Sequence, residues 1–401
     1  AGLYKAYKIL KNTSFKNKIL LLESNNRLGG RIYTYHDEIY KRGIEAGAGR
    51  FHKGHTCLIN LIKELGLEDK IIKIPTNKQY IPKPNTPEPK ESPEKYIKEI
   101  IKSAKTTPIE VLQGQTFLEY AKKILPKDNP PPTKVILDSF GYSSELTDMN
   151  TYDTINLIKD HYIQSEYYGI KGGMEQIVTK LINILIKYKN FQYKLREPVV
   201  DIYPNNDENN KIIIKTSKTT YITNNCICTL IKEDLEKIPI FRSIKSNLKG
   251  IKNLPLCRIY SIFPKDPETN KVWFHNLHKM TTNNNIRFII PINQEEGIIM
   301  ISYTDNKYAD YWYNIYKKEG IRVLNRELQT KIQEIFPDKK IPLPKHTKVF
   351  YWKYGVAYYQ PNFDSRNDLK KIRQPFPELP IYIHGENYSE KNIQWIEGAL
   401  E

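Results

Sequence analysis

The stretch LLLESNNRLGGRIYT, residues 20–34, joins the end of an apolar run to a carboxylate and a Gly-Gly-Arg sequence. The apolar residues predict a short buried strand, and Glu23 lies at its end. In dinucleotide-binding units an acidic residue at this place accepts ribose hydroxyls, about twenty positions after the last glycine of a Gly-rich turn. Gly2 lies twenty-one positions before Glu23 and begins an expected helix, whose positive end favours phosphate. The stretch therefore predicts a nucleotide held against backbone.

The Gly-Gly-Arg sequence, residues 29–31, adds a second indication of the same kind. Gly29 and Gly30 allow a close backbone approach, and the planar guanidinium of Arg31 suits paired phosphate oxygens. The alternative is an ordinary turn after a strand with an arginine on the surface. The carboxylate and the turn together favour the nucleotide.

The composition excludes few classes of protein. The chain has 401 residues, 39% hydrophobic content and a net charge of +17. This charge invites a nucleic-acid interpretation, but the lysines are scattered, and Lys, Asn, Ile and Tyr are enriched together. We therefore expect a solvated basic surface and no specific nucleic acid. No stretch approaches eighteen apolar residues, so no membrane span is expected.

Cysteine usage favours a reducing compartment. The four cysteines are too few for a disulfide framework in a chain of this length. Cys226 and Cys228 share one face of an expected strand, and their spacing does not match a zinc site. We expect reduced, packed thiols, a cytoplasmic location and no metal site.

Helices alternating with short apolar strands predict an α/β fold with inserted segments. The pattern of 55–67 is an amphipathic helix that ends at Gly66. Six prolines between residues 75 and 93 leave no regular element there, so an excursion from the first domain begins at 75. The last residues, 379–401, predict strand, loop and helix. The first domain is expected at 1–74, 166–240 and 375–401, and the second at 75–165 and 241–374.

At this point the sequence resembles the flavin-containing amine oxidases, a family with monoamine, polyamine and L-amino-acid oxidases. Several islands carry the resemblance in the right order along the chain. They are AGLYKAYKIL (1–10), LLLESNNRLGGRIYT (20–34), GIEAGAGRFHKGHTCLINLIKELGL (43–67), GGMEQIVTKL (172–181), PVVDI (198–202) and IYIHGENYSEKNIQWIEGALE (381–401). The first island looks like the tail of the family's Gly-rich helix, which suggests a fragment that lacks its first strand and leading glycines.

The resemblance implies a discontinuous, Rossmann-like FAD-binding domain with an inserted α+β substrate-binding domain. Glu23 and Arg31 would hold FAD, residues 47–50 would lie along the isoalloxazine, and Glu386 would meet the ribityl or pyrophosphate region. Trp395 and Ile396 would approach the flavin at the start of the last helix. The cofactor-binding residues implied in this way are Gly2, Glu23, Ser24, Gly29, Gly30, Arg31, Gly47, Ala48, Gly49, Arg50, Val199, Gly385, Glu386, Trp395 and Ile396.

The resemblance also implies oxidation of a carbon–nitrogen bond, with hydride transfer to flavin N5 and reduction of O2 to hydrogen peroxide. Arg50 occupies the place where amino-acid oxidases keep an arginine that binds the substrate carboxylate. Its alternative role is support of the flavin or of a neighbouring acid. Tyr358 or Tyr359 would form one wall of the pocket and Trp395 the opposite wall, although simple packing also explains the tyrosines. His52 and His55 are expected at the surface.

Three positions bear on the activity. Arg258 stands where the family carries a lysine that holds a water near flavin N5, so we count Arg258 among the catalytic candidates. A guanidinium stays charged, so slower reoxidation by oxygen is one consequence. Isoleucines in RFIIPIN (287–293) replace a carboxylate-binding tyrosine, which leaves amines other than amino acids open. Val356 replaces the cysteine of covalent members, so FAD is expected to bind noncovalently.

The leading prediction is an FAD-dependent amine or amino-acid oxidase with a small-molecule substrate. Alternatives within the same resemblance are a desaturase or porphyrinogen-type oxidase, and a flavin-binding structural or interaction protein without turnover. A nucleic-acid role is the last alternative. The assembly state stays open, and a homodimer is one of the assemblies allowed.

Overall fold

The computed structural model describes residues 1–162, 166–205, 207 and 211–401. These residues form two compact units, each assembled from segments distant in the chain. Unit 1 comprises Ala1–Ile74, Leu157–Lys252 and Asp364–Glu401, and unit 2 comprises Pro75–Asn156 and Asn253–Phe363. These edges differ from the expected internal boundaries at 166, 240 and 375, and the roles expected for the two domains stay predictions.

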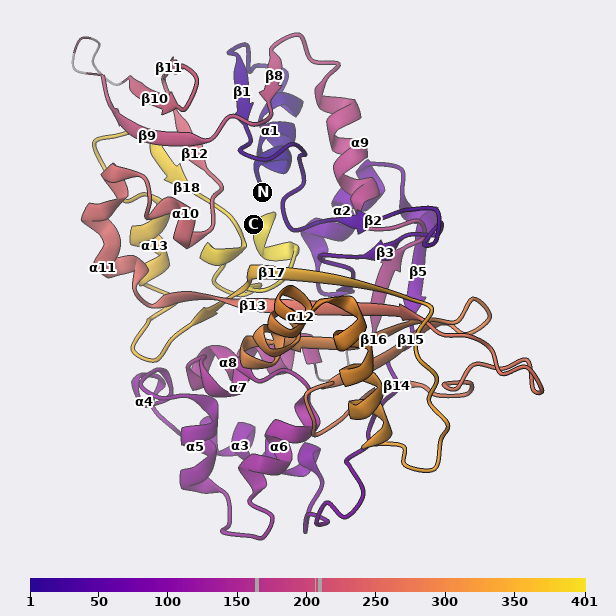
Figure 1. The fold of residues 1–401 in the computed structure, drawn as a ribbon. Helices are drawn as coiled ribbons and strands as arrows, with labels where there is room; N and C mark the ends of the chain where they lie inside the picture. Colours follow the sequence, from indigo (N-terminus) through magenta and orange to yellow (C-terminus); the bar gives the residue numbers. More distant parts are fainter. Residues whose placement is uncertain (163–165, 206, 208–210) are drawn as a thin grey trace. The chain divides into compact units, whose positions relative to one another are not determined.

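Two pairs of parallel strands lie in unit 1. One pair is β1 (Ile19–Leu22) with β8 (Phe191–Lys194), and the other is β12 (Cys226–Cys228) with β18 (Ile381–Ile383). Each pair joins segments more than 150 residues apart, as the colours of Figure 1 show. Cys226 and Cys228 are both buried, so they share a face as predicted.

Three helices enclose the main core of unit 1. Helix α1 (Gly2–Lys11) buries the stripe Leu3, Ala6, Tyr7 and Leu10, which recurs at helical spacing. Helix α2 (Thr56–Glu64) and helix α9 (Glu175–Leu185) add their apolar faces to the same core. The chain leaves α2 through Gly66 at a φ of +65°, and Leu67 N–H donates to the Ile62 carbonyl. This arrangement is a Schellman cap, which explains the predicted helix end.

Small sheets and short helices complete unit 1. One sheet has the order β4-β7-β5, another β11-β10-β9, and β2 pairs with β3. Their bounds are β2 (Thr34–Tyr35), β3 (Ile44–Glu45), β4 (Phe51–His52), β5 (Ile71–Ile74), β7 (Tyr167–Ile170), β9 (Val199–Pro204), β10 (Ile212–Thr216) and β11 (Thr220–Thr223). The short helices are η1 (Glu68–Lys70), η2 (Ile158–Tyr162), α10 (Lys232–Leu235), η3 (Pro239–Ile244), α11 (Lys245–Leu248), α13 (Asp368–Arg373), η4 (Glu386–Tyr388) and η5 (Glu397–Ala399).

A six-stranded sheet with the order β17-β13-β16-β15-β14-β6 forms the centre of unit 2. Its strands are β6 (Lys78–Tyr80), β13 (Ile251–Ile262), β14 (Lys279–Thr281), β15 (Phe288–Asn293), β16 (Ile298–Asp305) and β17 (His346–Tyr359). Helix α12 (Asn306–Gln333) packs against this sheet through Trp312, Leu324 and Leu328, and it bends at Gly320, whose φ is +82°. The remaining helices are α3 (Pro93–Ala104), α4 (Ile109–Gln113), α5 (Phe117–Ile124), α6 (Pro132–Phe140), α7 (Ser144–Thr147) and α8 (Thr151–Leu157).

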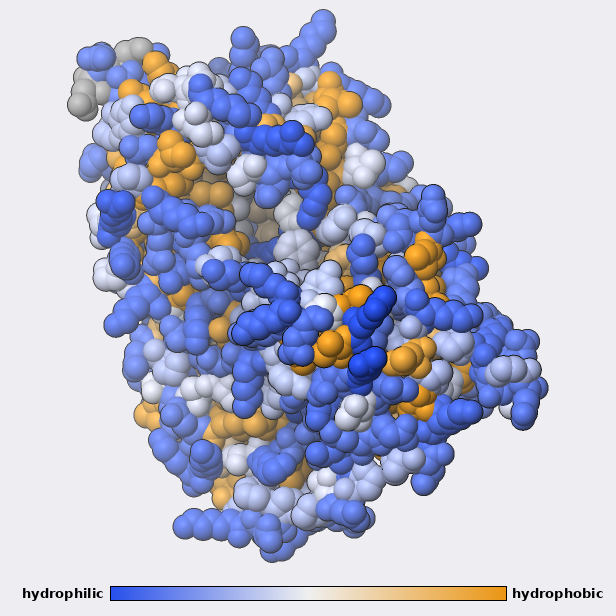
Figure 2. Space-filling view, viewed as in Figure 1, coloured by the Kyte–Doolittle hydropathy of each residue, from blue (hydrophilic) through white to orange (hydrophobic). Residues whose placement is uncertain are grey.

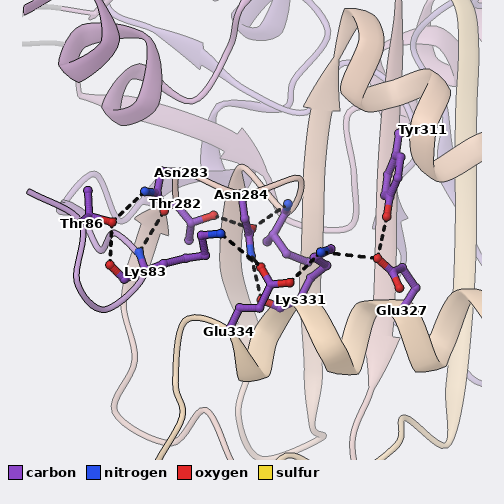
Figure 3. A network of polar contacts seen from close by, with 10 residues as sticks. Lys83, Thr86, Thr282, Asn283, Asn284, Tyr311, Glu327, Lys331 and Glu334 are labelled. Carbon is purple, nitrogen blue, oxygen red and sulfur yellow. Dashed lines mark hydrogen bonds and ion pairs between the residues drawn. The ribbon is translucent and has the colours of Figure 1, made fainter. Parts of the chain in front are cut away.

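A polar network ties the proline-rich segment to the rest of unit 2 (Figure 3). The Lys83 N–H donates to Asn283 Oδ1 at 2.9 Å, and Asn284 Nδ2 donates to the Lys331 carbonyl of α12 at 2.7 Å. Glu334 receives Lys331 Nζ at 2.6 Å and Lys83 Nζ at 3.7 Å. These contacts fix the position of the proline-rich segment, which its prolines prevent from forming a helix.

Two predictions about regular structure were wrong. Strand β6 lies inside the proline-rich segment and pairs in parallel with β14. It sits at the sheet edge and bonds on one side only, where nearby prolines are tolerated. The final helix is only the three-residue 3₁₀ helix η5, because Gln394 has a φ of +74° just before it.

The surface carries its charge broadly. Hydrophilic side chains spread over the visible faces of both units, with small apolar groups between them (Figure 2). Among the described residues, no helix combines the length and apolar content that a membrane span requires. All four cysteines are free, as predicted.

Candidate functional site

Glu23 directly follows β1, and its backbone continues the pairing of β1 with β8. The Glu23 N–H donates to the Lys194 carbonyl at 2.9 Å, which places the side chain at the strand tip. Its Oε1 accepts from the Asn25 N–H and from Asn25 Nδ2, both at 2.8 Å. Ser24 is exposed beside it, and Ser24 Oγ donates to the same Oε1 at 3.3 Å. Within the part of the chain that the structure describes, Glu23 Oε2 receives no hydrogen bond and can take a further donor.

The N-terminus of α1 lies beside this strand. A Cβ added to Gly2 would stand 3.6 Å from the Leu21 side chain and 3.2 Å from Thr229 Oγ1. No side chain caps the helix, so its first N–H groups and its positive dipole end stay available to an anion. A helix start and a carboxylate at the next strand tip are the two parts of the expected dinucleotide site.

The Gly-Gly-Arg turn is joined to the C-terminal segment by an ion pair. Gly29 and Gly30 have φ values of 106° and 57°, which glycine adopts without strain. Arg31 Nη2 lies 2.6 Å from Glu386 Oε2, and the Glu386 side chain is 5% exposed. Glu386 Oε1 accepts the Gln394 N–H at 2.6 Å, so this carboxylate also orders the approach to Trp395.

Arg27 also shapes this turn, although sequence reasoning missed it. Its guanidinium donates to the carbonyls of Leu28, Gly30 and Ile32 and lies over the Tyr33 ring. The only sequence signal was a second arginine four positions before Arg31. The side chain of Arg27 therefore stabilises the backbone of the turn.

Residues 47–49 run against the same turn. A Cβ on Gly47 would lie 2.0 Å from the Arg31 carbonyl oxygen, so only glycine fits. The Ala48 N–H donates to that oxygen at 3.0 Å. This close contact fixes the backbone that leads through Gly49 and Arg50 into the next strand, β4.

Arg50 belongs to an aromatic cluster in unit 1. Its guanidinium carbon lies 4.5 Å from the Tyr167 ring centroid and 5.4 Å from that of Trp395. Tyr167 and Trp395 are nearly parallel, at 10° with centroids 6.1 Å apart. Trp395 is 7% exposed, and its buried Nε1 has no hydrogen-bond partner among the described residues. The cluster therefore places the Arg50 guanidinium among aromatic rings, and the N–H group at Trp395 Nε1 can donate a hydrogen bond to a ligand.

His52 and His55 were expected at the surface, and this prediction was wrong. Their side chains are 7% and 0% exposed, because β4 and the start of α2 direct them into unit 1 beside Trp395. Burial, followed by the neighbouring His52 and His161, lowers the pKa of His55 to about 2. Burial, followed by His52, lowers the pKa of His161 to about 3. Both rings are therefore neutral near pH 7.

His161, in η2, was missed because no local signal marks it. It stands alone in its sequence segment, more than 100 positions from His52. Its ring stacks on Trp395, with centroids 5.0 Å apart and an interplanar angle of 21°. Only the tertiary structure joins it to the other two histidines.

The predicted catalytic residues of unit 2 lie on its sheet. Arg258 in β13 faces Tyr303 in β16, and its Nη2 donates to Tyr303 Oη at 3.2 Å. The guanidinium carbon also lies 4.5 Å from the Tyr303 ring centroid. Tyr358 and Tyr359 end β17 and are 1% and 0% exposed. Their role in a pocket wall stays a prediction.

The other predicted cofactor residues all lie in unit 1. Val199 begins β9, Gly385 precedes η4 with a φ of 137°, and Ile396 caps η5. Gly385 lines a cavity of about 320 Å³ together with His384, Arg373 and Lys391. This cavity carries basic side chains beside the segment of the expected flavin signature.

Comparison with known proteins agrees with this arrangement. The family described as flavin-containing amine oxidoreductase matches residues 1–401. Wild-type putrescine oxidase bound to putrescine is similar to the chain, with a TM-score of 0.76 and 14% identity over 100% of this chain and 94% of that one. A double mutant from a redesign of cofactor binding in putrescine oxidase gives the same values.

A candidate protoporphyrinogen oxidase from Exiguobacterium sp. 255-15 is similar too, with a TM-score of 0.71 and 14% identity over 100% of this chain and 94% of that one. Comparison with curated proteins returned no match. At such low identity the solved structures show the fold, whereas the family match rests on the sequence itself.

The fold is that of the FAD-dependent amine oxidases, with a Rossmann-like flavin domain. The chain belongs to the flavin-containing amine oxidoreductase family, and the protein is an FAD-dependent oxidoreductase. The predicted family, α/β class and cofactor are thereby confirmed.

The residues present fit FAD. Glu23 keeps an oxygen available for ribose hydroxyls, and the first turn of α1 has uncapped N–H groups for the pyrophosphate. A Cβ on Gly30 would meet nothing within 4 Å, which leaves open space above the turn. The buried Nε1 of Trp395 and Nε2 of Gln394 lack partners and can donate to a bound ring.

Proposed function

We propose that this protein oxidises the carbon–nitrogen bond of a small amine or L-amino acid. Bound FAD would take a hydride from the carbon next to nitrogen and pass the electrons to O2, which yields an imine and hydrogen peroxide. The chain itself has to hold the cofactor, orient the substrate and keep the amine neutral.

The proposed cofactor contacts divide by the part of FAD that each would meet. Glu23 and Ser24 would bind the ribose, and Val199 the adenine end. Gly2, Gly29, Gly30 and Arg31 would lie at the pyrophosphate, with Gly385 and Glu386 beyond it. Residues 47–50, Trp395 and Ile396 would line the ring system, and FAD would be bound noncovalently.

The observation that carries the proposal is the position of Arg50. Its guanidinium lies over Tyr167 and next to Trp395, while the adjacent histidines are neutral. A cation among neutral rings attracts a carboxylate and can bind it in a bidentate way. The same charge lowers the pKa of an ammonium placed beside it, which favours the neutral amine needed for oxidation.

The test is an anaerobic visible spectrum of the FAD-loaded protein, recorded while L-amino acids, polyamines and aromatic monoamines are added in turn. Bleaching of the flavin band by one class supports the proposal and identifies the substrate class. If amino acids bleach the flavin, Arg50→Met is expected to lower kcat/KM about 100-fold, because a charge-assisted pair contributes up to about 3 kcal/mol.

The matched control is Arg322→Met, which removes an exposed arginine from α12 in unit 2. Its kcat/KM is expected to equal that of the unchanged protein. Bleaching by a porphyrinogen and by no amine would contradict the proposal in favour of another substrate. A flavin band that no substrate bleaches would indicate a flavoprotein without turnover.

A further inference from the structure

Three buried histidines converge in unit 1 from three separate segments. His52 ends β4, His55 precedes α2, and His161 lies in η2. Their side chains are 7%, 0% and 1% exposed. One ring nitrogen from each lies within 4.8 Å of the other two, and His161 Nδ1 is 2.7 Å from His52 Nε2 and 3.4 Å from His55 Nε2.

The hydrogen bonds of this triad are incomplete. The Gly54 N–H donates to His52 Nδ1 at 3.0 Å, so the proton of a neutral His52 is on Nε2 and points to His161 Nδ1. His55 Nε2 faces the same acceptor at a longer distance. Among the residues that the structure describes, His55 Nδ1 is buried with no hydrogen-bond partner, and the Lys391 backbone is the polar group that acts on His161. Ring nitrogens of His52 and His55 thus both face His161 Nδ1, which is an unusual arrangement for buried polar groups.

We propose that His52, His55 and His161 bind one Zn²⁺ ion. Imidazole nitrogen is a preferred zinc ligand at 2.0–2.1 Å, and three histidines with an open fourth position are a known zinc coordination. In a tetrahedron of that size the nitrogens stand roughly 3.4 Å apart. The separations from His161 Nδ1, 2.7 and 3.4 Å, lie close to this value, and the ligand nitrogens are all within 4.8 Å of one another.

Zinc binds the unprotonated nitrogen of an imidazole, so each ring has to present a lone pair to the ion. For His52 Nε2 this requires the proton on Nδ1, which would displace the hydrogen bond from the Gly54 N–H, and Gly54 is exposed to water. A Cβ at Gly54 would lie 2.8 Å from the His52 ring, so glycine leaves this ring its room.

The charged groups around the three histidines indicate which kind of fourth ligand would complete the zinc site. Arg50 and Asp160 are the charged groups that act on His52, with opposite sign. Because Arg50 adds a positive charge near the ion, an anion is favoured at the open position. Hydroxide has the required charge. Tyr167 and Trp395 cover the triad and restrict access of water.

The experiment titrates ZnCl₂ into the chelator-treated, FAD-loaded protein by calorimetry. One ion per chain is expected, and His55→Gln and His161→Gln should each weaken binding at least about 10-fold, as loss of a direct ligand does. His278→Gln removes an exposed histidine of unit 2 and is the matched control with unchanged affinity. No stoichiometric binding, or equal affinity in all three variants, would overturn the proposal.

A second measurement does not depend on the folding of the variants. Anomalous scattering at the zinc edge from crystals of the unchanged protein should show one peak between the three rings. A peak elsewhere in the chain, or none, would show a histidine cluster held by hydrogen bonds alone. Because zinc binding is measured without turnover, this outcome is independent of whether amines reduce the flavin.

Discussion

Arg31 and Glu386 stand 355 positions apart in the chain, and their side chains form an ion pair of 2.6 Å. The Glu386 carboxylate is 5% exposed and also accepts from Asn387 Nδ2 and the Gln394 N–H. The pair therefore joins the Gly-Gly-Arg turn to the C-terminal segment. Removal of one partner would leave the other with an uncompensated charge.

Substitution of Arg31 by Met should lower the free energy of unfolding by about 3 kcal/mol, because it leaves Glu386 buried without its cation. Urea denaturation of the flavin-free protein measures this change. Lys11→Met is the control, since the pair of Lys11 with Glu64 is exposed and screened by solvent and should contribute little to stability. Equal losses in the two variants would contradict a structural role of the buried pair.

Gly47→Ala tests the contact between residues 47–49 and the turn. The added Cβ would stand 2.0 Å from the Arg31 carbonyl oxygen, so the backbone has to move. We expect a loss of about 3 kcal/mol in stability, at the upper end of overpacking effects, together with weaker FAD binding. Gly66→Ala has open space around its Cβ and should lose only about 1 kcal/mol from its left-handed conformation. Thermal melts and flavin fluorescence titration provide both values.

The pH dependence of stability should include a contribution from His384. Burial, followed by the charges of Lys5 and Arg373, lowers its pKa from 6.5 to about 4. The unfolded chain therefore binds a proton at this residue between pH 6.5 and pH 4 while the folded protein does not. The stabilising contribution is complete above pH 6.5 and is lost as the pH falls through about 4.

The measurement for His384 compares melting temperatures of the unchanged protein and His384→Gln at pH 7.5 and pH 4.5, values chosen on either side of about 6.5. The unchanged protein should lose more stability on acidification than the variant does. Parallel losses in both proteins would show that His384 does not titrate in this way. The other buried histidines contribute equally to both proteins and cancel in the difference.

Arg258 should affect the reaction of reduced flavin with oxygen. Its guanidinium is paired with Tyr303 and stays charged, whereas the lysine implied by the family resemblance can titrate. Arg258→Lys is expected to raise the rate of reoxidation about tenfold, equal to about 1.4 kcal/mol of barrier. Stopped-flow mixing of the reduced protein with oxygenated buffer measures the rate, and Arg258→Met serves as the control. A faster rate in both variants would assign the effect to loss of the guanidinium and not to a titrating lysine.

The proposed noncovalent binding of FAD makes a simple prediction. The cysteines Cys57, Cys226, Cys228 and Cys257 are free, and the family resemblance implies that Val356 replaces the cysteine of covalent members. Acid precipitation should therefore release the flavin into the supernatant. Flavin that stays with the precipitated protein would show a covalent bond at another residue.

Local parts of the site could be predicted from the sequence. The apolar run of β1 and the carboxylate after it need only neighbouring residues, and the helical stripe of α1 follows from a period of 3.6 residues. The end of α2 could also be predicted, because Gly66 adopts the left-handed conformation of the helix cap without strain. The family match to the whole chain agrees with these local patterns.

Predictions failed where a residue depends on a distant partner. The prolines around β6 excluded regular structure locally, yet β14 offered a sheet edge that accepts a short strand. His52 and His55 were expected at the surface, and nothing in the neighbouring residues indicated their burial. The fold turns both toward His161, more than 100 positions away.

The sequence by itself determined the class of this protein, because the apolar strand, the carboxylate after it and the Gly-Gly-Arg turn are adjacent residues with fixed conformational preferences. Only the tertiary structure decided that Arg31 meets Glu386 and that three histidines share one buried space. Such contacts join segments through long-range packing, whose free energy comes from burying side chains together and leaves no periodic pattern along the chain.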